Sequence, residues 1–452
     1  MSSVLEERLR DWLPNQRWYA GGARQIHAVR VESSTDLDAP ETAGLSLLIL
    51  AVDHGDGVER YQLLLGVRAE LPERLEHVRI GTDDDAVWYD AAHDAELTER
   101  LLVAIAGDLD SGPLRFRSVP SAQLDTEQPS LAIPQEQTNT SLVYGDEYIL
   151  KMFRRLGAGA NPDLEVTLAL AQVGSEHIAE PLGWIETDLD GQPTTLALLQ
   201  RFLRTGTDGW LLAAASVRDL YAEGDLHADE VGGDFAAESE RLGAATASVH
   251  RDLARSLGTK KGTERDVTAA AAAMRRRLDD ACNEVPSLAT HADAIREVYD
   301  AMETRTQAFD TQRVHGDYHL GQVMRTAEGW VLLDFEGEPA RPLAERRTMT
   351  SPLKDIAGML RSFDYAAQHL LIEQYGDKQH DIRALEWSDR NQNAFCDGYA
   401  AEMGVDPREQ GELLRAFELD KAVYEAMYES RHRPGWVSIP FGAMERILGA
   451  LT

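Results

Sequence analysis

The chain has 452 residues, of which 43% are hydrophobic and 27% charged, as is ordinary for a globular protein of two or three domains. With 77 Asp and Glu against 45 Lys and Arg, the formal net charge is −32, which argues against nucleic acid or an anionic membrane as a partner. No apolar run approaches the ~18 residues of a membrane span and the N-terminus lacks a signal-peptide core, so we expect a cytoplasmic protein.

The first 90 residues predict a small module of antiparallel strands. A short amphipathic helix over residues 5–13 stops at a proline. Apolar runs at residues 29–31, 45–52 and 61–67 follow, and Asp and Gly turns separate them. Trp18 stands in an aromatic cluster between the helix and the strands. Such a cluster is more often an anchor for a module than a ligand site, and we favour the anchor.

Residues 131–153 predict strand, polar loop, strand, turn and strand. The loop at residues 135–141 stands where kinases carry a glycine-rich phosphate loop, but it has no G-x-G-x-x-G pattern. Hydroxyl, amide and backbone N–H groups would instead cover the phosphates of ATP. The residues predicted for this contact are Gln137, Thr138, Asn139, Thr140 and Ser141.

Lys151 alternates with apolar neighbours in the last of these strands, so its side chain can point away from the core face. Asn-Pro-Asp at residues 161–163 then begins a helix, with proline in its first turn. Glu165 lies on that helix. This order is typical of the kinase pair in which a strand lysine binds the phosphates and a helix glutamate positions it. A surface ion pair is the plainer alternative.

Residues 197–203 resemble the strand and hinge that join the two lobes of a kinase, and we expect Gln200 and Phe202 to meet adenine. Residues 207–310 are mostly helical by their period. Within them, His250-Arg-Asp-Leu253 spells the catalytic tetrapeptide of protein kinases. However, Leu257 stands where an amide is needed, so we interpret this run as the surface of a helix.

The strongest signal is Arg313-Val-His-Gly-Asp-Tyr-His-Leu-Gly-Gln322. Asp317 lies in its Gly-flanked turn, and Asp334 later ends an apolar run that predicts a buried strand. A turn carboxylate, an amide and a strand-end carboxylate in this order are typical of kinase-fold phosphotransferases. Asp317 would orient a substrate hydroxyl and accept its proton, while Gln322 and Asp334 would hold Mg²⁺ against ATP.

Two neighbours are expected to support these groups. His315 would brace the turn by hydrogen bonding, and Glu336 would add a bridging or outer contact to the metal. The alternative for the whole stretch is an ordinary turn followed by a solvated strand end.

Helices are predicted at residues 353–365, 367–375, 387–403 and 410–432. On the last, Glu425 and Tyr428 share one face with a glutamate and a histidine. Carboxylates accept from hydroxyls and rings pack on sugars, so this face suits a sugar site, although a solvated helix face is the alternative.

Several motifs together resemble the bacterial maltokinases. They are Asn15-Gln-Arg-Trp-Tyr-Ala-Gly21, Glu136-Gln-Thr-Asn-Thr-Ser141, Ser216-Val-Arg-Asp-Leu-Tyr-Ala-Glu-Gly-Asp225, His315-Gly-Asp-Tyr-His-Leu-Gly-Gln322, Asp334-Phe-Glu-Gly-Glu-Pro339 and Phe417-Glu-Leu-Asp-Lys-Ala-Val-Tyr424. The resemblance implies an α+β, bilobal protein-kinase-like (aminoglycoside phosphotransferase-like) fold with an N-terminal cap. We therefore divide the chain into a cap at 1–90, a small ATP-binding lobe at 91–203 and a helical lobe at 204–452.

The resemblance implies transfer of the ATP γ-phosphoryl group to maltose, giving maltose 1-phosphate in trehalose and glycogen metabolism. A glucosamine, hexose or other aminosugar kinase of the same fold is the alternative. Resemblance and helix geometry together nominate Asp355, Arg361, Glu425, Tyr428, Arg431 and Trp436 as sugar contacts. A pseudokinase fits less well because the lysine, base and metal carboxylate are all present, and a protein kinase because no Ala-Pro-Glu segment follows Asp334. We expect a monomer.

Overall fold

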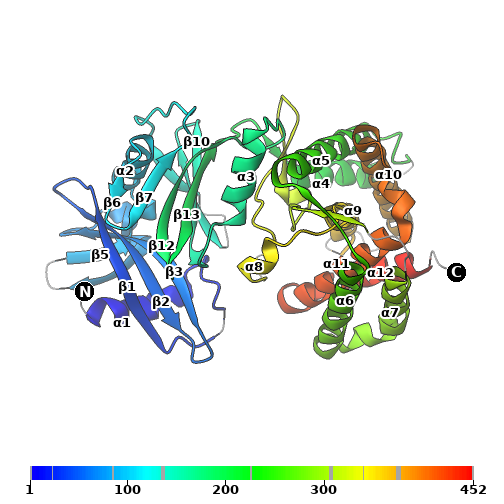
Figure 1. Cartoon of the computed structure of the whole chain (residues 1–452), viewed down its shortest axis with the longest axis horizontal. Helices are drawn as coiled ribbons and strands as arrows, with labels where there is room; N and C mark the ends of the chain where they lie inside the picture. The colour runs from blue at the N-terminus through cyan, green and yellow to red at the C-terminus, as the bar shows by residue number, and fades with distance from the viewer. Residues whose placement is uncertain are drawn as a thin grey trace. The chain divides into compact units, whose positions relative to one another are not determined.

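The computed structural model of the chain describes residues 3–22, 24–83, 86–133, 138–223, 226–304, 309–338, 341–372 and 378–449. It divides into two compact units (Figure 1). The first comprises Met1–Leu168 and Ala179–Arg204, and the second comprises Ala169–Ile178 and Thr205–Thr452.

The first unit begins with an antiparallel sheet, drawn in blue in Figure 1. Its strands run in the order β1 (Ala28–Leu37), β2 (Gly44–Asp53), β3 (Val58–Arg68), β5 (Ala86–Asp90) and β4 (Arg79–Asp83), and β11 (Arg155–Leu156) also pairs with β3. Helix α1 (Ser3–Trp12) packs on this sheet through Leu5, Leu9 and Trp12. Trp18 is buried in the same apolar cluster, which agrees with its interpretation as an anchor.

A second sheet of the first unit has the order β6 (Asp110–Ser111), β7 (Leu114–Ser118), β12 (Pro181–Leu189), β13 (Gln192–Arg201), β10 (Tyr148–Phe153), β9 (Asn139–Tyr144) and β8 (Ser130–Ile133). Helix α2 (Ala95–Ala106) contacts β7, β8 and β12. One apolar cluster includes Leu47 of the first sheet, Leu101 of α2 and Leu150 of the second sheet. The N-terminal module and the second sheet therefore share a core.

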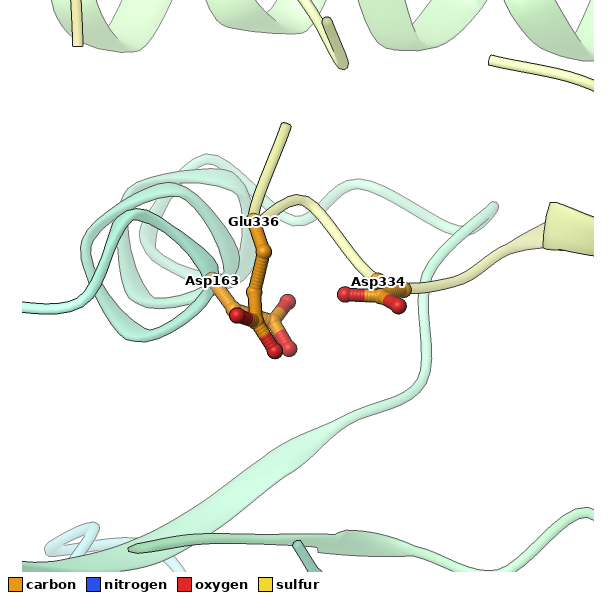
Figure 2. A group of neighbouring side chains, drawn as sticks. All are labelled: Asp163, Asp334 and Glu336. Atoms are coloured by element: carbon orange, nitrogen blue, oxygen red, sulfur yellow. The ribbon is translucent and has the colours of Figure 1, made fainter. Parts of the chain in front are cut away.

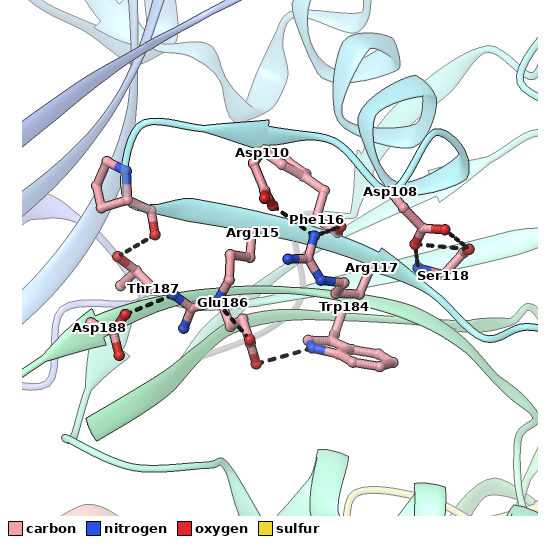
Figure 3. Close-up of polar contacts among 11 residues, drawn as sticks. Asp108, Asp110, Arg115, Phe116, Arg117, Ser118, Trp184, Glu186, Thr187 and Asp188 are labelled. Atoms are coloured by element: carbon pink, nitrogen blue, oxygen red, sulfur yellow. Dashed lines mark hydrogen bonds and ion pairs between the residues drawn. The ribbon is translucent and has the colours of Figure 1, made fainter. Parts of the chain in front are cut away.

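Charged side chains are paired across β7 and β12 of this sheet (Figure 3). Arg115 contacts Glu186 and Asp188 across the two strands, at 2.9 and 2.6 Å, and Glu186 also accepts from Trp184 Nε1 at 3.1 Å. These partly exposed pairs give the charged side chains on this face of the sheet their partners but contribute little to its stability.

The second unit is mostly helical. Its longer helices are α4 (Gly209–Ala222), α5 (Ala236–Leu257), α6 (Glu264–Glu284), α7 (Ala289–Glu303), α9 (Leu353–Leu370), α10 (Lys378–Met403), α11 (Gly411–His432) and α12 (Ser438–Gly449). The short helix α8 (Leu343–Arg346) precedes α9. A small sheet orders β14 (Thr207–Asp208), β17 (Val323–Arg325) and β18 (Trp330–Leu332), and β15 (Thr259–Lys261) pairs with β16 (Asp310–Gln312). No described helix is both long and apolar enough to cross a membrane.

Most expected elements are present, although α10 begins at Lys378 and not at residue 387 as expected, and there are two further departures. The first is that Asn139, Thr140 and Ser141 belong to strand β9, because all three pair with β10 in the sheet. The predicted polar loop is shorter by these residues. The second is that α9 continues to Leu370 and includes part of the separate helix expected at residues 367–375.

Candidate active site

A buried carboxylate fixes the turn that carries Asp317. Asp355, in the first turn of α9, is 1% exposed. It accepts hydrogen bonds from the backbone N–H groups of His315 at 2.7 Å and Gly316 at 2.9 Å. Gly316 has a φ of 88°, a backbone conformation that glycine adopts more easily than other residues, which explains why a glycine stands at this position of the turn. Asp355 therefore sets the backbone of the turn.

Two predictions are corrected here. Asp355 is unsuited to the predicted sugar contact, because it is buried and its oxygens already bond His315, Gly316 and His250. His250 lies on α5 as expected, but it is 1% exposed and not on a helix surface. Its Nε2 lies 3.1 Å from Asp355 Oδ2 and its Nδ1 lies 3.0 Å from the Tyr399 hydroxyl. The sequence offered no signal for this long-range network.

His315 bridges the turn to the following strand. Its Nε2 lies 2.7 Å from the carbonyl oxygen of Leu333, the residue before Asp334. Its ring packs against Tyr318 and Phe335, with centroids 5.2 and 4.9 Å away. The structure thus gives His315 the bracing contacts that its position predicts.

Asp317 lies beside a cation that the sequence analysis did not identify. Lys421 Nζ of α11 is 3.2 Å from Asp317 Oδ1. Burial opposes ionisation of Asp317, but Lys421 and the neighbouring histidines outweigh it and hold its pKa below the usual range. Burial also lowers the pKa of His319 to about 4. Asp317 is therefore an ionised acceptor at neutral pH.

The predicted metal ligands of the second unit flank the hairpin of β17 and β18, with Gln322 just before β17 and Asp334 just after β18. Asp334 has a φ of 63°, an uncommon conformation for a residue other than glycine and one found at functional sites. Gln322 Nε2 lies 3.4 Å from Asp334 Oδ2, so the two predicted ligands are neighbours. Figure 2 shows Asp334 and Glu336 on the same loop. Carboxylate and amide oxygens are the ligands that Mg²⁺ prefers, so Gln322, Asp334 and Glu336 fit this ion.

In the first unit, a carboxylate lies beside Lys151. Lys151 Nζ is 3.3 Å from Asp163 Oδ2, in the first turn of α3 (Pro162–Gln172). The Asn161 side chain accepts the Asp163 backbone N–H at 2.8 Å and so caps this helix. Figure 2 also draws Asp163. The sequence analysis predicted Glu165 as the partner of Lys151. Glu165 lies two residues after Asp163, and residues two apart on a helix point to different faces.

The predicted phosphate contacts are only partly suitable. Gln137 lies outside the described residues, whereas Thr138 directly precedes β9. Thr140 and Ser141 are 6% and 1% exposed. The Thr140 hydroxyl accepts from Arg154 Nε at 2.8 Å. Burial within β9 therefore corrects the prediction for Thr140 and Ser141, whose side chains are parts of the sheet, and leaves Thr138 and Asn139 as candidates.

The expected adenine contacts have internal roles at the end of β13. Gln200 Nε2 donates to the Ala179 carbonyl at 3.4 Å. The Phe202 backbone N–H donates to the Glu147 carbonyl at 2.8 Å. Because this N–H is already used, an adenine contact through it is ruled out in this conformation.

Two further predicted sugar contacts form a buried ion pair. Arg361 on α9 is 1% exposed and donates from Nε and Nη2 to Glu425 Oε2 on α11, at 3.0 and 2.8 Å. Arg361 also donates to Asp364, which contacts Arg446 of α12. This network joins three helices. Arg361 and Glu425 are therefore structural partners, and the sugar contacts predicted for them are corrected.

The remaining predicted sugar contacts lie near the surface of the second unit. Tyr428 is 37% exposed and stacks on His432, with centroids 4.4 Å apart. Arg431 pairs with Glu284 of α6. Trp436 packs against the Arg433 guanidinium at 4.2 Å. These groups have accessible surface, so their roles in binding a sugar stay predictions.

A cavity of about 520 Å³ adjoins the turn at Gly316. Its wall includes Arg277 of α6, Glu338 of the loop after Asp334, and Lys354 of α9. Arg277 is paired with Asp420. The cavity lies within the second unit and combines paired charges with apolar residues, as a polar small molecule needs.

Two family models and several known proteins are similar to this chain. Residues 12–94 match the maltokinase N-terminal cap domain, and residues 132–389 match the phosphotransferase enzyme family. A glucosamine kinase of Streptacidiphilus jiangxiensis is 30% identical over 318 residues, which cover 68% of this chain and 70% of the relative. A glucosamine kinase of Mycolicibacterium smegmatis is 27% identical over 389 residues, covering 81% of this chain and 91% of the relative.

A solved glucosamine kinase, in complex with glucosamine, ADP and inorganic phosphate, has the same fold. It superposes with a TM-score of 0.70 at 24% identity, covering 99% of this chain and 100% of that one. The predicted kinase-like fold with an N-terminal cap is thereby confirmed.

Proposed function

Because this chain belongs to the phosphotransferase enzyme family and is therefore a phosphotransferase with an alcohol group as acceptor, we propose that it is an ATP-dependent glucosamine kinase. The observation that carries the choice of sugar is the 30% identity to a glucosamine kinase over 70% of that relative's length. The ionised Asp317 beside a cavity for a polar molecule supplies the chemistry.

Asp317 orients the acceptor hydroxyl and takes its proton. As the hydroxyl oxygen forms a bond to the γ-phosphorus, the bond from that phosphorus to the bridging oxygen of ADP breaks. The products are the sugar phosphate and ADP. A carboxylate with a low pKa is a weak base, so its main contribution is to position the hydroxyl, with proton transfer late in the reaction.

The other polar groups bind the nucleotide. In the first unit, Lys151 supplies a positive charge for the phosphates, and Asp163 holds its ammonium in place. In the second unit, Asp334 and Gln322 would hold Mg²⁺. When bound, this ion neutralises phosphate charge and favours departure of ADP.

Maltose is the second candidate acceptor. The match of residues 12–94 to the maltokinase cap favours it. So does the pairing of Asp317 with Lys421, since a carboxylate already beside a cation attracts a charged amino group less strongly.

The test is ADP release with glucosamine, maltose and glucose at fixed salt, with products identified by NMR. We expect kcat/KM for glucosamine to exceed that for maltose at least tenfold, about 1.4 kcal/mol of discrimination. A tenfold preference for maltose would exchange the two candidates, and no turnover of any sugar would overturn the proposal.

A further inference from the structure

The predicted base is in contact with a lysine from a distant part of the chain. Lys421 Nζ of α11 lies 3.2 Å from Asp317 Oδ1 and 3.9 Å from Glu338 Oε1. The side chains of Lys421, Asp317 and Glu338 are 17%, 20% and 4% exposed. Because these charges are largely removed from water, their attraction is stronger than that of a surface ion pair.

Helix α11 is held in place independently of Asp317. Arg277 of α6 donates to both oxygens of Asp420, the residue before Lys421, at 2.8 and 2.6 Å. One turn earlier, Phe417 packs edge-on against Phe309. The helix therefore presents Lys421 to the turn without relying on the contact with Asp317.

The turn has no strong cation of its own. Between His315 and Gln322 the sequence contains neither lysine nor arginine. Lys421 contacts Oδ1 of Asp317, which leaves Oδ2 for an acceptor hydroxyl. A carboxylate held by one oxygen has a fixed rotamer, and phosphoryl transfer depends on such positioning.

We propose that Lys421 is a positioning residue, which fixes the Asp317 carboxylate in its ionised form with Oδ2 directed at the acceptor hydroxyl. The proposal rests on Asp317 as the base of the proposed function. The low pKa of Asp317 agrees with it, as burial alone would raise that pKa. Glu338, Glu425 and Tyr424 also surround Lys421 and favour its charged form.

The first test is Lys421→Met, which keeps most of the side-chain length but removes the charge. We expect kcat to fall about 10- to 100-fold while KM for ATP changes less than about threefold. The acidic limb of the kcat profile should move to higher pH, because His315 and His319 alone then favour the ionised Asp317. Lys421→Arg, which restores the charge, should return the limb to its original pH.

Lys354→Met is the matched control. Lys354 and Lys421 both line a second, smaller pocket beside Gly316 and both are partly buried, but no ion pair joins Lys354 to another residue that the structure describes. Its loss should leave the acidic limb in place. The proposal is wrong if Lys421→Met leaves that limb unmoved, or if both variants move it equally. If Lys421→Met does not fold, Lys421→Arg provides the test. An acidic limb in that variant that lies away from its wild-type pH would contradict the proposal.

These outcomes are separate from failure of the proposed function. An Asp317→Asn enzyme that keeps its turnover would overturn the role of the base itself. An unmoved acidic limb in Lys421→Met, with Asp317→Asn inactive, would overturn only the role of Lys421.

Discussion

In each unit a fully buried charged residue lies next to a predicted functional segment, and these two residues, Arg154 and Asp355, hold different groups. In the first unit, Arg154 is 0% exposed and donates to Asp90 at 2.7 Å and to Thr140 at 2.8 Å. In the second, Asp355 is 1% exposed and accepts two backbone N–H groups of the turn that carries Asp317. Arg154 joins side chains of different strands, whereas Asp355 fixes backbone.

The two networks also differ in completeness. Arg154 Nη1 has no hydrogen-bond partner among the described residues, although the guanidinium lies 4.6 Å from the Trp18 ring. Both oxygens of Asp355 are hydrogen-bonded. Because Asp90 and Trp18 belong to the N-terminal module and Thr140 to β9, Arg154 ties this module to the strand that follows the predicted phosphate-binding residues. We infer that the module supports nucleotide binding, while Asp355 supports turnover.

Asp355→Ala should have the largest effect. It removes the acceptor of the buried N–H group of His315 and the partly buried one of Gly316, so we expect a loss of about 3–5 kcal/mol in the free energy of unfolding and a fall in kcat of at least about 100-fold. Urea unfolding and steady-state kinetics measure the two. A stable, active variant would show that the turn forms without this carboxylate.

Stability should also depend on the protonation of Asp355. The pKa of Asp355 lies below its usual value. Burial acts to raise this pKa, but the contacts with His250, His315 and the N–H of Gly316 outweigh burial. The stability from this group is thus present above the unfolded pKa of about 3.9 and lost as pH falls through the folded pKa. The unfolding free energy of wild type should fall more steeply with acid than that of Asp355→Ala, and parallel curves would contradict this.

Arg154→Met should have the next largest effect, and a different one. It leaves Asp90 buried without its cation, at a cost of about 3 kcal/mol in stability. We expect KM for ATP to rise several-fold while kcat at saturating ATP changes less than about threefold. A fall in kcat with unchanged KM would remove the functional distinction between Arg154 and Asp355.

Thr140→Val tests one contact of the Arg154 network. The change is nearly isosteric but removes the hydroxyl that accepts from Arg154 Nε. A cost of about 1–2 kcal/mol in unfolding free energy is expected, smaller than that of Arg154→Met because Asp90 keeps its partner. An equal cost would mean that Thr140, and not Asp90, is the main partner.

Arg431→Ala should have the smallest effect on stability. Arg431 is 59% exposed and pairs with the surface residue Glu284, so the unfolding free energy should change by less than about 0.5 kcal/mol. Because the variant should fold normally, a rise in KM for the sugar would report a lost contact between Arg431 and the sugar. An unchanged KM would remove Arg431 from the predicted contacts.

Local signals predicted some of these features and missed others. The strand that carries Lys151 and the turn that carries Asp317 follow from residue order and short-range patterns. Lys421 and His250 lie 104 and 105 residues from the partners Asp317 and Asp355, and no local pattern reports such contacts. The sugar face assigned to Glu425 failed for a related reason. A helical period shows which residues share a face but not whether Arg361 of another helix buries that face.

The role of Asp317 is tested most directly by measuring turnover and nucleotide affinity together in Asp317→Asn. The amide keeps the shape of the side chain but loses its charge and its capacity to accept the proton. We predict that ADP release with glucosamine falls by about 10²–10⁴-fold, while the calorimetric Kd for ATP–Mg²⁺ stays within about threefold of wild type. Turnover above a tenth of the wild-type value would contradict the assignment of Asp317 as the base.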